Sequence, residues 1–534
     1  MTLSPSRHAV VQTLKIIWTA FALYYELWTF YRHASSCTWP IIDQQTSSKV
    51  EHVLLVADPQ ILDMNSYPDR HPALQWLSQV VVDLNLRKNW RAALRTRPDK
   101  TIFLGDMMDN GRMSMGEQEY DAYYRRFRRV FKGSDADTVY YIPGNHDIGL
   151  GAPSAYSRSA QADERYVSHF GNPNKVVHTA GHALVMIDAP SLVDEDRQRV
   201  ARGQTFTDWP ASPNSTASFV KGLARQLEDT VPRILLTHIP LHRPPASDCG
   251  PLRERGTIRA GQGFGYENTI GADASRLLLD TIRPSFIFSG DDHDYCAYSH
   301  RYSGRTAEEI TVKSLSMAMG IRQPGYQLLS LAAPSAPSAT SHATTHCLLP
   351  DQLRIYLAIY IPLLLISLAA VVLINALEQR RSRLRPRPRI KTFRPLTRGV
   401  DLDMIRSPNW QQLHHREDEQ DVMTDESYVE LASPSRLSDE KARGALPAPA
   451  SSRARRSRPL QRVSGPLERA IGTMPRALQA FASLLKRTLQ SVLHSPRPSR
   501  SRGFVREVLY DVRDVAVFPI TIFCIITWWM FTDS

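Results

Sequence analysis

Short polar clusters rich in Asp, Asn and His recur between residues 50 and 300, and their residue types suit metal-dependent chemistry. The clusters read DPQ at 58–60, GDMMD at 105–109, GNHD at 144–147, H at 238 and GDDH at 290–293. Carboxylate and amide oxygens with a few imidazole nitrogens bind divalent cations of intermediate hardness. A carboxylate that bridges two cations is typical of sites that hydrolyse phosphate esters. The clusters therefore predict a two-metal phosphoryl-transfer site, and a set of strand-end caps and polar turns is the alternative.

Each cluster follows a short run of apolar residues, and the β-branched and aromatic content of these runs predicts buried strands. The predicted strands are Val53–Val56, Thr101–Leu104, Val139–Ile142, Leu184–Ile187, Ile234–Thr237 and Phe286–Ser289. Helical patterns alternate with them at Ala73–Arg97, Glu117–Phe131, Thr216–Asp229 and Ala272–Ile282. This alternation predicts an α/β (α+β) domain in which helices cover a sheet sandwich. Ligands of open α/β sheets gather at the carboxyl ends of the strands, where the polar clusters lie.

The order of the clusters resembles that of the calcineurin-like metallophosphoesterases over about residues 50–330. The segments ADPQILD at 57–63, SGDDHDYC at 289–296 and SLSMAMGIRQPGYQLLSL at 314–331 are similar to the fungal branch that remodels GPI-anchor glycans. The resemblance implies a four-layer β-sandwich domain flanked by helices. It also implies two bound divalent cations, which we expect to be Mn²⁺, with Mg²⁺ as the alternative. It also implies a reaction, the removal of ethanolamine phosphate from a mannose of the GPI glycan.

Residue roles follow from the same resemblance. The first metal would be held by Asp58, Gln60, Asp106 and His293. The second would be held by Asp106, Asn145, His238 and Asp291, so that Asp106 bridges the two. His146 would be the general acid and Asp147 would orient it, while Asp109 would steady the loop. The weaker candidates for substrate contact are Arg112 and His242.

Two of these positions differ from the wider superfamily. Gln60 and Asp291 each stand where His is usual, so the predicted site is richer in oxygen and poorer in nitrogen. Such a ligand set favours Mn²⁺ or Mg²⁺ over Zn²⁺. Because both altered segments resemble the GPI-remodelling branch, we expect a variant site and not an inactive one.

The net charge of +12 lies outside the predicted phosphoesterase domain. Residues 1–377 contain 37 basic and 36 acidic side chains, whereas residues 378–514 contain 28 and 16. A nucleic-acid-binding protein carries its basic face on the folded domain, so no nucleic-acid partner is expected. Residues 378–514 are rich in Arg, Ser and Pro and are predicted to be mostly disordered and cytosolic. Within them, Leu467–Leu493 is either a basic amphipathic helix on the membrane or a short solvated helix.

Three apolar stretches predict the membrane topology. Leu14–Tyr31 is predicted to be an uncleaved signal-anchor, with a signal peptide as the alternative. Leu353–Leu377 is a predicted transmembrane helix, and the basic residues after it mark the cytosolic side. Val515–Phe531 is a predicted third span, with a hydrophobic hairpin or surface anchor as the alternative. This topology makes residues 1–13 cytosolic and residues 32–350 lumenal, with the phosphoesterase core at 50–331.

A lumenal domain agrees with a glycosylation sequon at Asn214 and with a disulfide between Cys249 and Cys296, which we predict from their positions. The expected location is the membrane of the endoplasmic reticulum or early Golgi. The expected partners are the GPI glycan, membrane lipids and cargo-sorting proteins of exit from the endoplasmic reticulum. Two other functions remain open: a phosphatase for lipid or protein monoesters, and a non-catalytic, Mn²⁺-responsive membrane adaptor.

Overall fold

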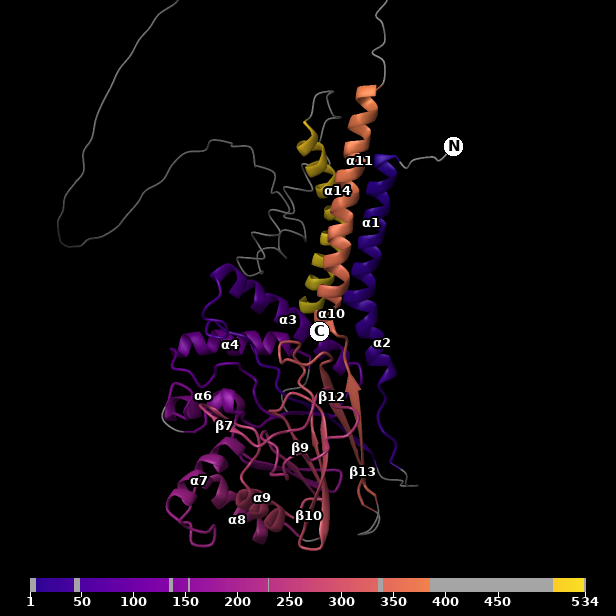
Figure 1. The fold of residues 1–534 in the computed structure, drawn as a ribbon. Coiled ribbons are helices and arrows are strands. Elements are labelled where there is room, and N and C mark those ends of the chain that lie inside the picture. The colour runs from indigo at the N-terminus through magenta and orange to yellow at the C-terminus, as the bar shows by residue number, and fades with distance from the viewer. Residues whose placement is uncertain are drawn as a thin grey trace, which may run out of the picture. The chain divides into compact units, whose positions relative to one another are not determined.

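A computed structural model describes residues 6–42, 49–133, 138–151, 154–228, 230–334, 340–384 and 503–532. These residues form an α/β domain and a group of long helices (Figure 1). The predicted cytosolic region, including the helix expected at Leu467–Leu493, lies almost entirely outside the described residues.

The first sheet has five strands in the order β13-β12-β1-β2-β3. Its parallel part comprises β1 (Glu51–Val56), β2 (Lys100–Phe103) and β3 (Val139–Tyr141). Its antiparallel part comprises β12 (Gly325–Leu331) and β13 (His342–Leu348).

The second sheet has six strands in the order β10-β11-β9-β6-β5-β4. Three central strands, β5 (His182–Met186), β6 (Arg233–Leu236) and β9 (Phe286–Ser289), run parallel to one another. The remaining strands are β4 (Lys175–Thr179), β10 (Cys296–Tyr302) and β11 (Arg305–Thr311). A separate pair, β7 (Gln262–Gly263) and β8 (Tyr266–Glu267), forms a short hairpin.

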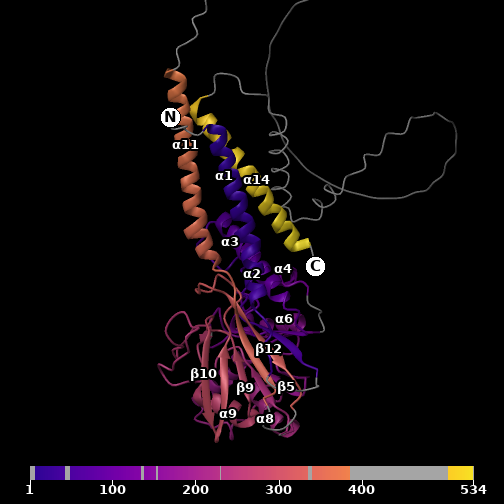
Figure 2. The same cartoon turned by 90° about the vertical axis from the view of Figure 1, so that its right-hand side faces the viewer.

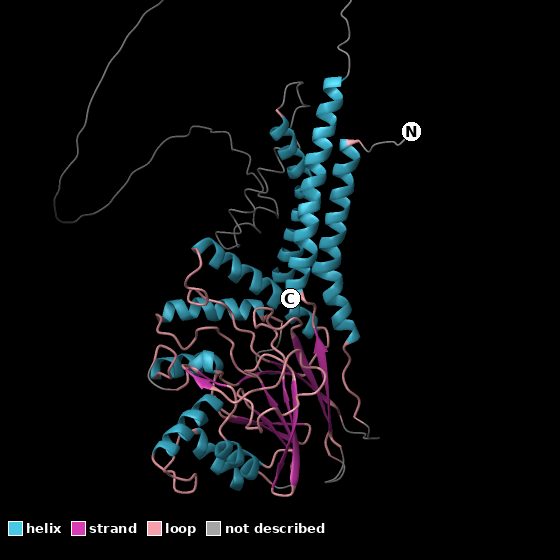
Figure 3. Ribbon diagram, viewed as in Figure 1, coloured by secondary structure: helices cyan, strands magenta, loops and turns pink. Residues whose placement is uncertain are grey.

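Three apolar cores hold these layers together. The central core lies between the two sheets, and its side chains come from β1, β2, β5, β6, β9 and β12. A second core joins the five-stranded sheet to α3 (Pro72–Leu94), α4 (Glu117–Val130) and α6 (Ala160–Phe170). A third joins the six-stranded sheet to α7 (Ala189–Ala201), α8 (Thr216–Gln226) and α9 (Ala272–Ile282). These three cores place the two sheets between two layers of helices. Figure 3 colours the helices and strands of the domain.

The predicted α/β class is confirmed. All six predicted strands and all four predicted helices are present, with ends that differ by a few residues. The strands β4 and β10–β13 and the helices α6 and α7 were not predicted. Several of these strands, such as β13 with the sequence HATTHCL, are too polar to stand out as buried strands.

Beside the domain lie three long helical segments (Figures 1 and 2). The first comprises α1 (Arg7–Leu23), η1 (Tyr24–Trp28) and α2 (Thr29–Ser36). The second comprises α10 (Gln352–Arg354), η3 (Ile355–Tyr360) and α11 (Ile361–Leu384), and the third is α14 (Phe504–Thr532). Their contact includes Val11, Leu14, Val371 and Val515. We call these three segments the helix bundle.

Within the described residues, two helices are long and apolar enough to cross a membrane, Gln352–Leu384 and Phe504–Thr532. They contain the predicted spans 353–377 and 515–531. The predicted signal-anchor 14–31 is not one of the two, although it is helical and packs against both. Its role as a span stays a prediction.

Glu26 is the one acidic residue within the apolar stretch 14–31, and the structure explains how it is accommodated. Its side chain is buried and forms an ion pair with Lys88 Nζ of α3 at 2.6 Å. Tyr360 also donates its hydroxyl to Glu26 Oε1, at 2.8 Å. A buried charge requires such partners because its desolvation is costly. Glu26 therefore joins the helix bundle to the α/β domain.

Two disulfides cross-link the domain. Cys249–Cys296 confirms the predicted pair and joins the loop after β6 to the start of β10. Cys37–Cys347, which was not predicted, joins the end of the first helical segment to β13. The sequon residue Asn214 is exposed in a turn that precedes α8.

Candidate metal centre

The polar clusters meet at the carboxyl ends of five parallel strands from the two sheets. Asp58 follows β1, Asp106 follows β2, Asn145 follows β3, His238 follows β6 and Asp291 follows β9. Several of these residues have left-handed backbone angles, with φ of 47° at Asp58, 55° at Asp106 and 65° at Asp291. Such angles cost free energy in residues other than glycine and tend to cluster at functional sites. The turns direct the side chains into one buried space.

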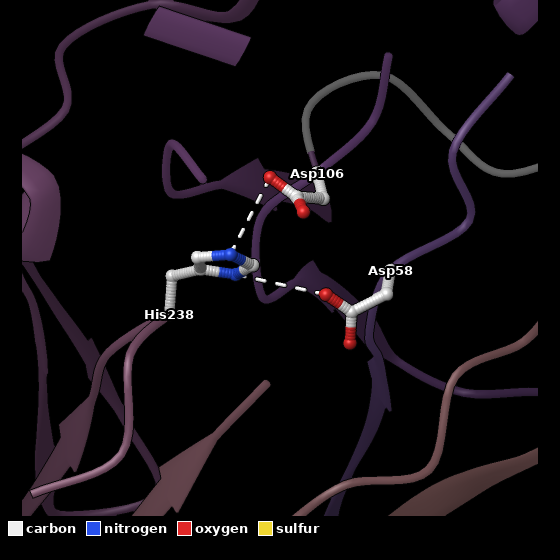
Figure 4. A group of neighbouring side chains, drawn as sticks. All are labelled: Asp58, Asp106 and His238. Atoms are coloured by element: carbon white, nitrogen blue, oxygen red, sulfur yellow. Dashed lines mark ion pairs between the residues drawn. The ribbon is translucent and has the colours of Figure 1, made fainter. Parts of the chain in front are cut away.

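Asp58, Asp106 and His238 form the centre of this cluster and are completely or almost completely buried. One possible ligand atom from each lies within 4.8 Å of the others (Figure 4). His238 Nε2 lies 3.4 Å from Asp106 Oδ1, and His238 Nδ1 lies 3.9 Å from Asp58 Oδ1. This spacing suits the ligands of a shared cation.

The other predicted ligands surround this centre. His238 Nε2 also lies 3.1 Å from Asn145 Oδ1 and 3.4 Å from Asp291 Oδ1. On the other side, Gln60 Nε2 lies 2.9 Å from Asp106 Oδ2 and 3.4 Å from His293 Nε2. The structure thus brings all seven predicted ligands together, with Asp106 between the two groups.

The electrostatics of the cluster fit a bound cation. Burial, together with the nearby carboxylates of Asp106 and Asp291, raises the pKa of Asp58 well above its usual range. Asp58 Oδ2 is buried and has no hydrogen-bond partner among the described residues. A buried carboxylate oxygen of this kind needs a compensating positive charge. The residues present therefore fit a divalent metal.

The pKa values of Asp106 and His238 shift so that both groups favour their charged forms, in contrast to Asp58. Burial opposes charge on both, but the imidazole rings of His238 and His146 hold the pKa of Asp106 well below its usual range. The carboxylates of Asp106, Asp291 and Asp58 raise the pKa of His238 well above its usual range. A cation that binds here would replace the His238 proton, because a metal ligand must be the neutral imidazole.

Two glycines allow the turns to approach closely. A Cβ atom at Gly105 would overlap the ring of His238, and one at Gly144 would overlap the carboxylate of Asp106. Gly105 also has a positive φ of 100°. These positions therefore require glycine on two independent grounds: space at both and backbone conformation at Gly105.

Known proteins resemble this chain over the region that contains the clustered side chains. The family model described as calcineurin-like phosphoesterase matches residues 52–295. Cell division control protein 1 of Saccharomyces cerevisiae is 36% identical over 364 residues, which cover 64% of this chain and 70% of that protein. The chain belongs to the calcineurin-like phosphoesterase family.

More distant relatives carry the name metallophosphoesterase 1. The Caenorhabditis elegans homologue is 23% identical over 304 residues, 56% of this chain and 75% of its own. The Ailuropoda melanoleuca protein is 25% identical over 348 residues, 62% of this chain and 82% of its own. The predicted family is therefore confirmed, and with it the fold that positions the metal cluster.

His146 lies at the edge of this phosphoesterase site. Its side chain is about one-quarter exposed, at 26%, so it is accessible from outside the buried cluster. Its Nδ1 lies 2.5 Å from the main-chain oxygen of Asp109 and 3.6 Å from Asp109 Oδ1. Donation from Nδ1 to the carbonyl leaves Nε2 for a reacting group.

Asp147 was predicted to orient His146, but its carboxylate forms its described hydrogen bonds with main-chain N–H groups of the turns after β2 and β3. Its carboxylate accepts hydrogen bonds from the main-chain N–H of Met108 at 3.0 Å and of Gly144 at 2.9 Å. Burial and the charge of Asp106 raise the pKa of Asp147 to about 7. In this structure, Asp109 is the acidic residue beside the His146 ring, and Asp147 holds together the turns after β2 and β3.

Arg112 was a weak candidate for phosphate contact, and the structure gives it a positioning role. Its Nη1 donates to the main-chain oxygens of Asn145 at 3.1 Å and Gly265 at 3.2 Å. Burial lowers its pKa although nearby acids oppose that shift. The side chain therefore braces the loop that carries the predicted metal ligand Asn145. His242, the other weak candidate, is exposed, and its main-chain N–H bonds to Ser275 Oγ at 2.8 Å.

Three positioning contacts were missed by the sequence argument. Asn145 Nδ2 donates to the carbonyl of Gly265 at 2.7 Å, which fixes the amide so that its oxygen faces His238. Ser314 Oγ donates to the main-chain carbonyl of Asp58 at 2.7 Å. The main-chain N–H of Ser314 donates to the main-chain carbonyl of His293 at 2.9 Å. Gly265 is 120 residues from Asn145 and Ser314 is 256 residues from Asp58, so no local pattern indicated these two contacts.

Proposed function

We propose that this phosphoesterase hydrolyses a phosphodiester on a membrane-anchored glycan, by removing ethanolamine phosphate from a mannose of the GPI anchor. The observation that carries the proposal is the direction in which the metal centre faces. The substrate class rests on the segments at 57–63, 289–296 and 314–331, which resemble the GPI-remodelling branch.

The metal centre lies at the edge of the sheets nearest the helix bundle. Strand β13 runs in the same direction as β1, because both are antiparallel to β12. Only three residues separate the end of β13 from α10, where the chain enters the bundle. The carboxyl ends of β1–β3 therefore lie on the bundle side of the domain. This placement supports a substrate whose phosphate is close to the membrane.

Different residues would bind the cations and donate the proton. Asp58, Gln60, Asp106 and His293 would hold one cation, and Asp106, Asn145, His238 and Asp291 the other. Bound divalent cations supply Lewis acidity toward the phosphate and the attacking water. His146, held by Asp109, would donate a proton from Nε2 to the departing alkoxide oxygen of mannose. The oxygen-rich ligand set supports Mn²⁺ or Mg²⁺.

The proposed location is the lumen of the endoplasmic reticulum or early Golgi. Two disulfides within the domain support an oxidising compartment, because disulfides rarely persist in the cytosol. The exposed position of Asn214 is compatible with glycosylation there.

The test uses the full-length protein in detergent with a GPI glycan that carries ethanolamine phosphate. We expect Mn²⁺-dependent release of ethanolamine phosphate, detected by mass, and no release by Asp106→Asn. Release of phosphate from monoesters alone would replace the proposal with a phosphatase. A protein that binds no metal would indicate the non-catalytic adaptor.

A further inference from the structure

Helix α3 has two faces with different partners. One face contains Val82, Leu86 and Trp90, which are buried in the core beside the five-stranded sheet. The other face meets the helix bundle: Lys88 Nζ pairs with Glu26, at 2.6 Å. These contacts fix which side of α3 faces the bundle.

Three more contacts near the C-terminal end of α3 agree with this orientation. Arg91 Nη1 donates to the main-chain oxygen of Trp529 at 3.2 Å, and Arg87 Nε donates to that of Met530 at 2.7 Å. The guanidinium of Arg95 lies 4.4 Å from the ring centre of Tyr31. The C-terminal half of α3 is therefore covered by the ends of the bundle helices.

The same face continues as an apolar stripe in the N-terminal half of α3. Residues four, seven and eleven positions before Lys88 share its side of the helix. These residues are Leu84, Val81 and Leu77. Leu77 is 47% exposed, and its neighbours Leu74 and Trp76 are 57% and 50% exposed. The structure thus leaves Leu74 and Leu77 uncovered on the side of α3 that faces the bundle, and the exposed Trp76 lies about 100° round the helix from Leu77.

A cavity in the helix bundle reaches the apolar stripe of α3 at Val81. It has a volume of about 430 Å³, lies between α1, α11 and α14, and reaches Val81 of α3. Its lining is almost entirely apolar and includes Trp18, Leu364 and Phe523. The hydroxyl of Ser367, a polar exception, donates to the carbonyl of Leu363 at 2.7 Å. An apolar space between two helices that are long enough to cross a membrane suits acyl chains, and Val81 of α3 lies at its edge.

We propose that the N-terminal half of α3 lies in the lipid leaflet beside the bundle, with Leu74 and Leu77 in contact with acyl chains and Trp76 at the headgroup level. Apolar side chains on one face of a helix bury in this way at a membrane surface. Trp is enriched at the interface because its ring is apolar and its N–H is polar. The partner is the acyl-chain surface of the membrane that the bundle crosses.

The proposal also gives α3 a role in positioning the metal centre. On the domain side, Asn89 Nδ2 donates to the carbonyl of Leu315 at 2.7 Å. The adjacent Ser314 bonds to the carbonyl of Asp58, a predicted metal ligand. One helix therefore contacts lipid on one side and supports the ligand loops on the other. Its depth in the leaflet sets the distance between the metal centre and the lipid surface.

The first test measures the depth of Trp76 directly and does not depend on any activity. The full chain is reconstituted in vesicles that contain lipids with brominated acyl chains. We expect bromine to quench part of the tryptophan fluorescence, and the Trp76→Phe variant to lose that part. An equal quenched signal in both proteins would mean that Trp76 is outside the leaflet, and would overturn the proposal.

The second test uses activity and rests on the proposed function. Leu77→Glu should lower turnover of a lipid-anchored phosphodiester in vesicles by about ten-fold, because a charged side chain replaces an apolar one that contacts acyl chains. Turnover of the soluble diester bis(p-nitrophenyl) phosphate should not change. Val200→Glu on α7, at a site that is 61% exposed, is the matched control and should alter neither rate.

The two tests separate failure of the inference from failure of the proposed function. Equal loss with both diesters, or equal effects of Leu77→Glu and Val200→Glu, would contradict a membrane role for α3. Quenching of Trp76 without any hydrolysis would keep the membrane contact and remove the enzymatic proposal.

Discussion

Among the residues of the metal centre, His146 differs in its exposure. Its ring is about one-quarter exposed, whereas Asp58, Asp106 and His238 are buried. The buried carboxylates carry the charge that attracts cations, and the accessible imidazole can reach a leaving group. This division predicts that metal binding and proton donation can be separated by mutation.

For His146→Ala we expect bound Mn²⁺ to remain and turnover to fall by ~10²–10⁴-fold, the usual contribution of a general acid. Metal content measured by mass spectrometry and steady-state rates would show both effects. Asp106→Asn is the comparison, because it should lose metal and activity together. If His146→Ala also loses its metal, His146 is a ligand and its assignment as the acid is wrong.

His346 in β13 offers a prediction about stability at acidic pH. Burial, with a smaller effect of Lys313, lowers its pKa to about 4, and neither ring nitrogen has a hydrogen-bond partner among the described residues. The folded state therefore favours the neutral ring. Stability is lost as the pH falls from the unfolded-state pKa of about 6.5 toward 4, because only the unfolded chain takes up the proton.

Replacement of His346 by Leu should remove this pH-dependent loss. The free energy of unfolding should fall less between pH 7 and pH 5, by up to about 2 kcal/mol. Denaturant melts of the two proteins at both pH values would measure the difference. His242→Leu, at an exposed position, is the control. An unchanged pH dependence in His346→Leu would show that the ring is solvated in the folded protein.

At the scale of elements, α3 connects the ligand loops to the rest of the molecule. Asn85 Oδ1 accepts hydrogen bonds from Asn89 Nδ2 at 3.1 Å and from the main-chain N–H of Met317 at 3.4 Å. Together with the bond from Asn89 to Leu315, these contacts hold residues 314–317 beside the turn after β1. The amides of one helix therefore position Asp58, a predicted metal ligand that they do not touch.

We expect Asn89→Ala to destabilise the protein by ~1–3 kcal/mol, because the buried carbonyl of Leu315 loses its donor. The affinity for Mn²⁺ should fall by roughly 10–100-fold, as for other residues that orient ligands. Calorimetric titration with Mn²⁺ and thermal melts would measure both quantities. Asn268→Ala, which removes an exposed amide bonded to the carbonyl of Arg259, should change neither. A loss of stability with unchanged affinity would limit Asn89 to a structural role.

Six strands, four helices and the clustering of the predicted ligands could be predicted from sequence, but the contacts that position the ligand loops could not. Strands such as β1 and β9 are short apolar runs followed at once by polar turns, so both the strand and its ligands were visible locally. Polar strands such as β13 lacked that signal. The roles of Asp109 and Asp147 depend on which turn packs against which, and the role of Ser314 depends on a contact 256 residues away along the chain. Spacing along the chain does not contain that information.

At the scale of the whole molecule, buried polar contacts join the α/β domain to the helix bundle. The Glu26–Lys88 pair is the most buried of these, with side-chain exposures of 1% and 4%. Removal of one member of a buried pair leaves an uncompensated charge, which costs more than the pair itself contributes.

Lys88→Met alone should therefore lower the free energy of unfolding by ~3–5 kcal/mol, and adding Glu26→Gln should restore most of it. Thermal melts in detergent of the two single variants and the double variant would measure the coupling. Lys15→Met, which removes the more exposed pair with Asp514, should have a much smaller effect. Additive losses in the double variant would mean that the two charges do not interact in the folded protein.

The Cys37–Cys347 disulfide also determines how the domain carries mechanical load. It joins the residue after α2, where the chain leaves the helix bundle, to the edge strand β13, after which the chain enters the bundle again. A lateral pull between these helices is carried by the covalent bridge before it reaches the sheet. Without the bridge, the same pull would peel β13 from β12 one hydrogen bond at a time. We therefore expect the bridge to keep a pull between the two helices from reaching the ligand loops.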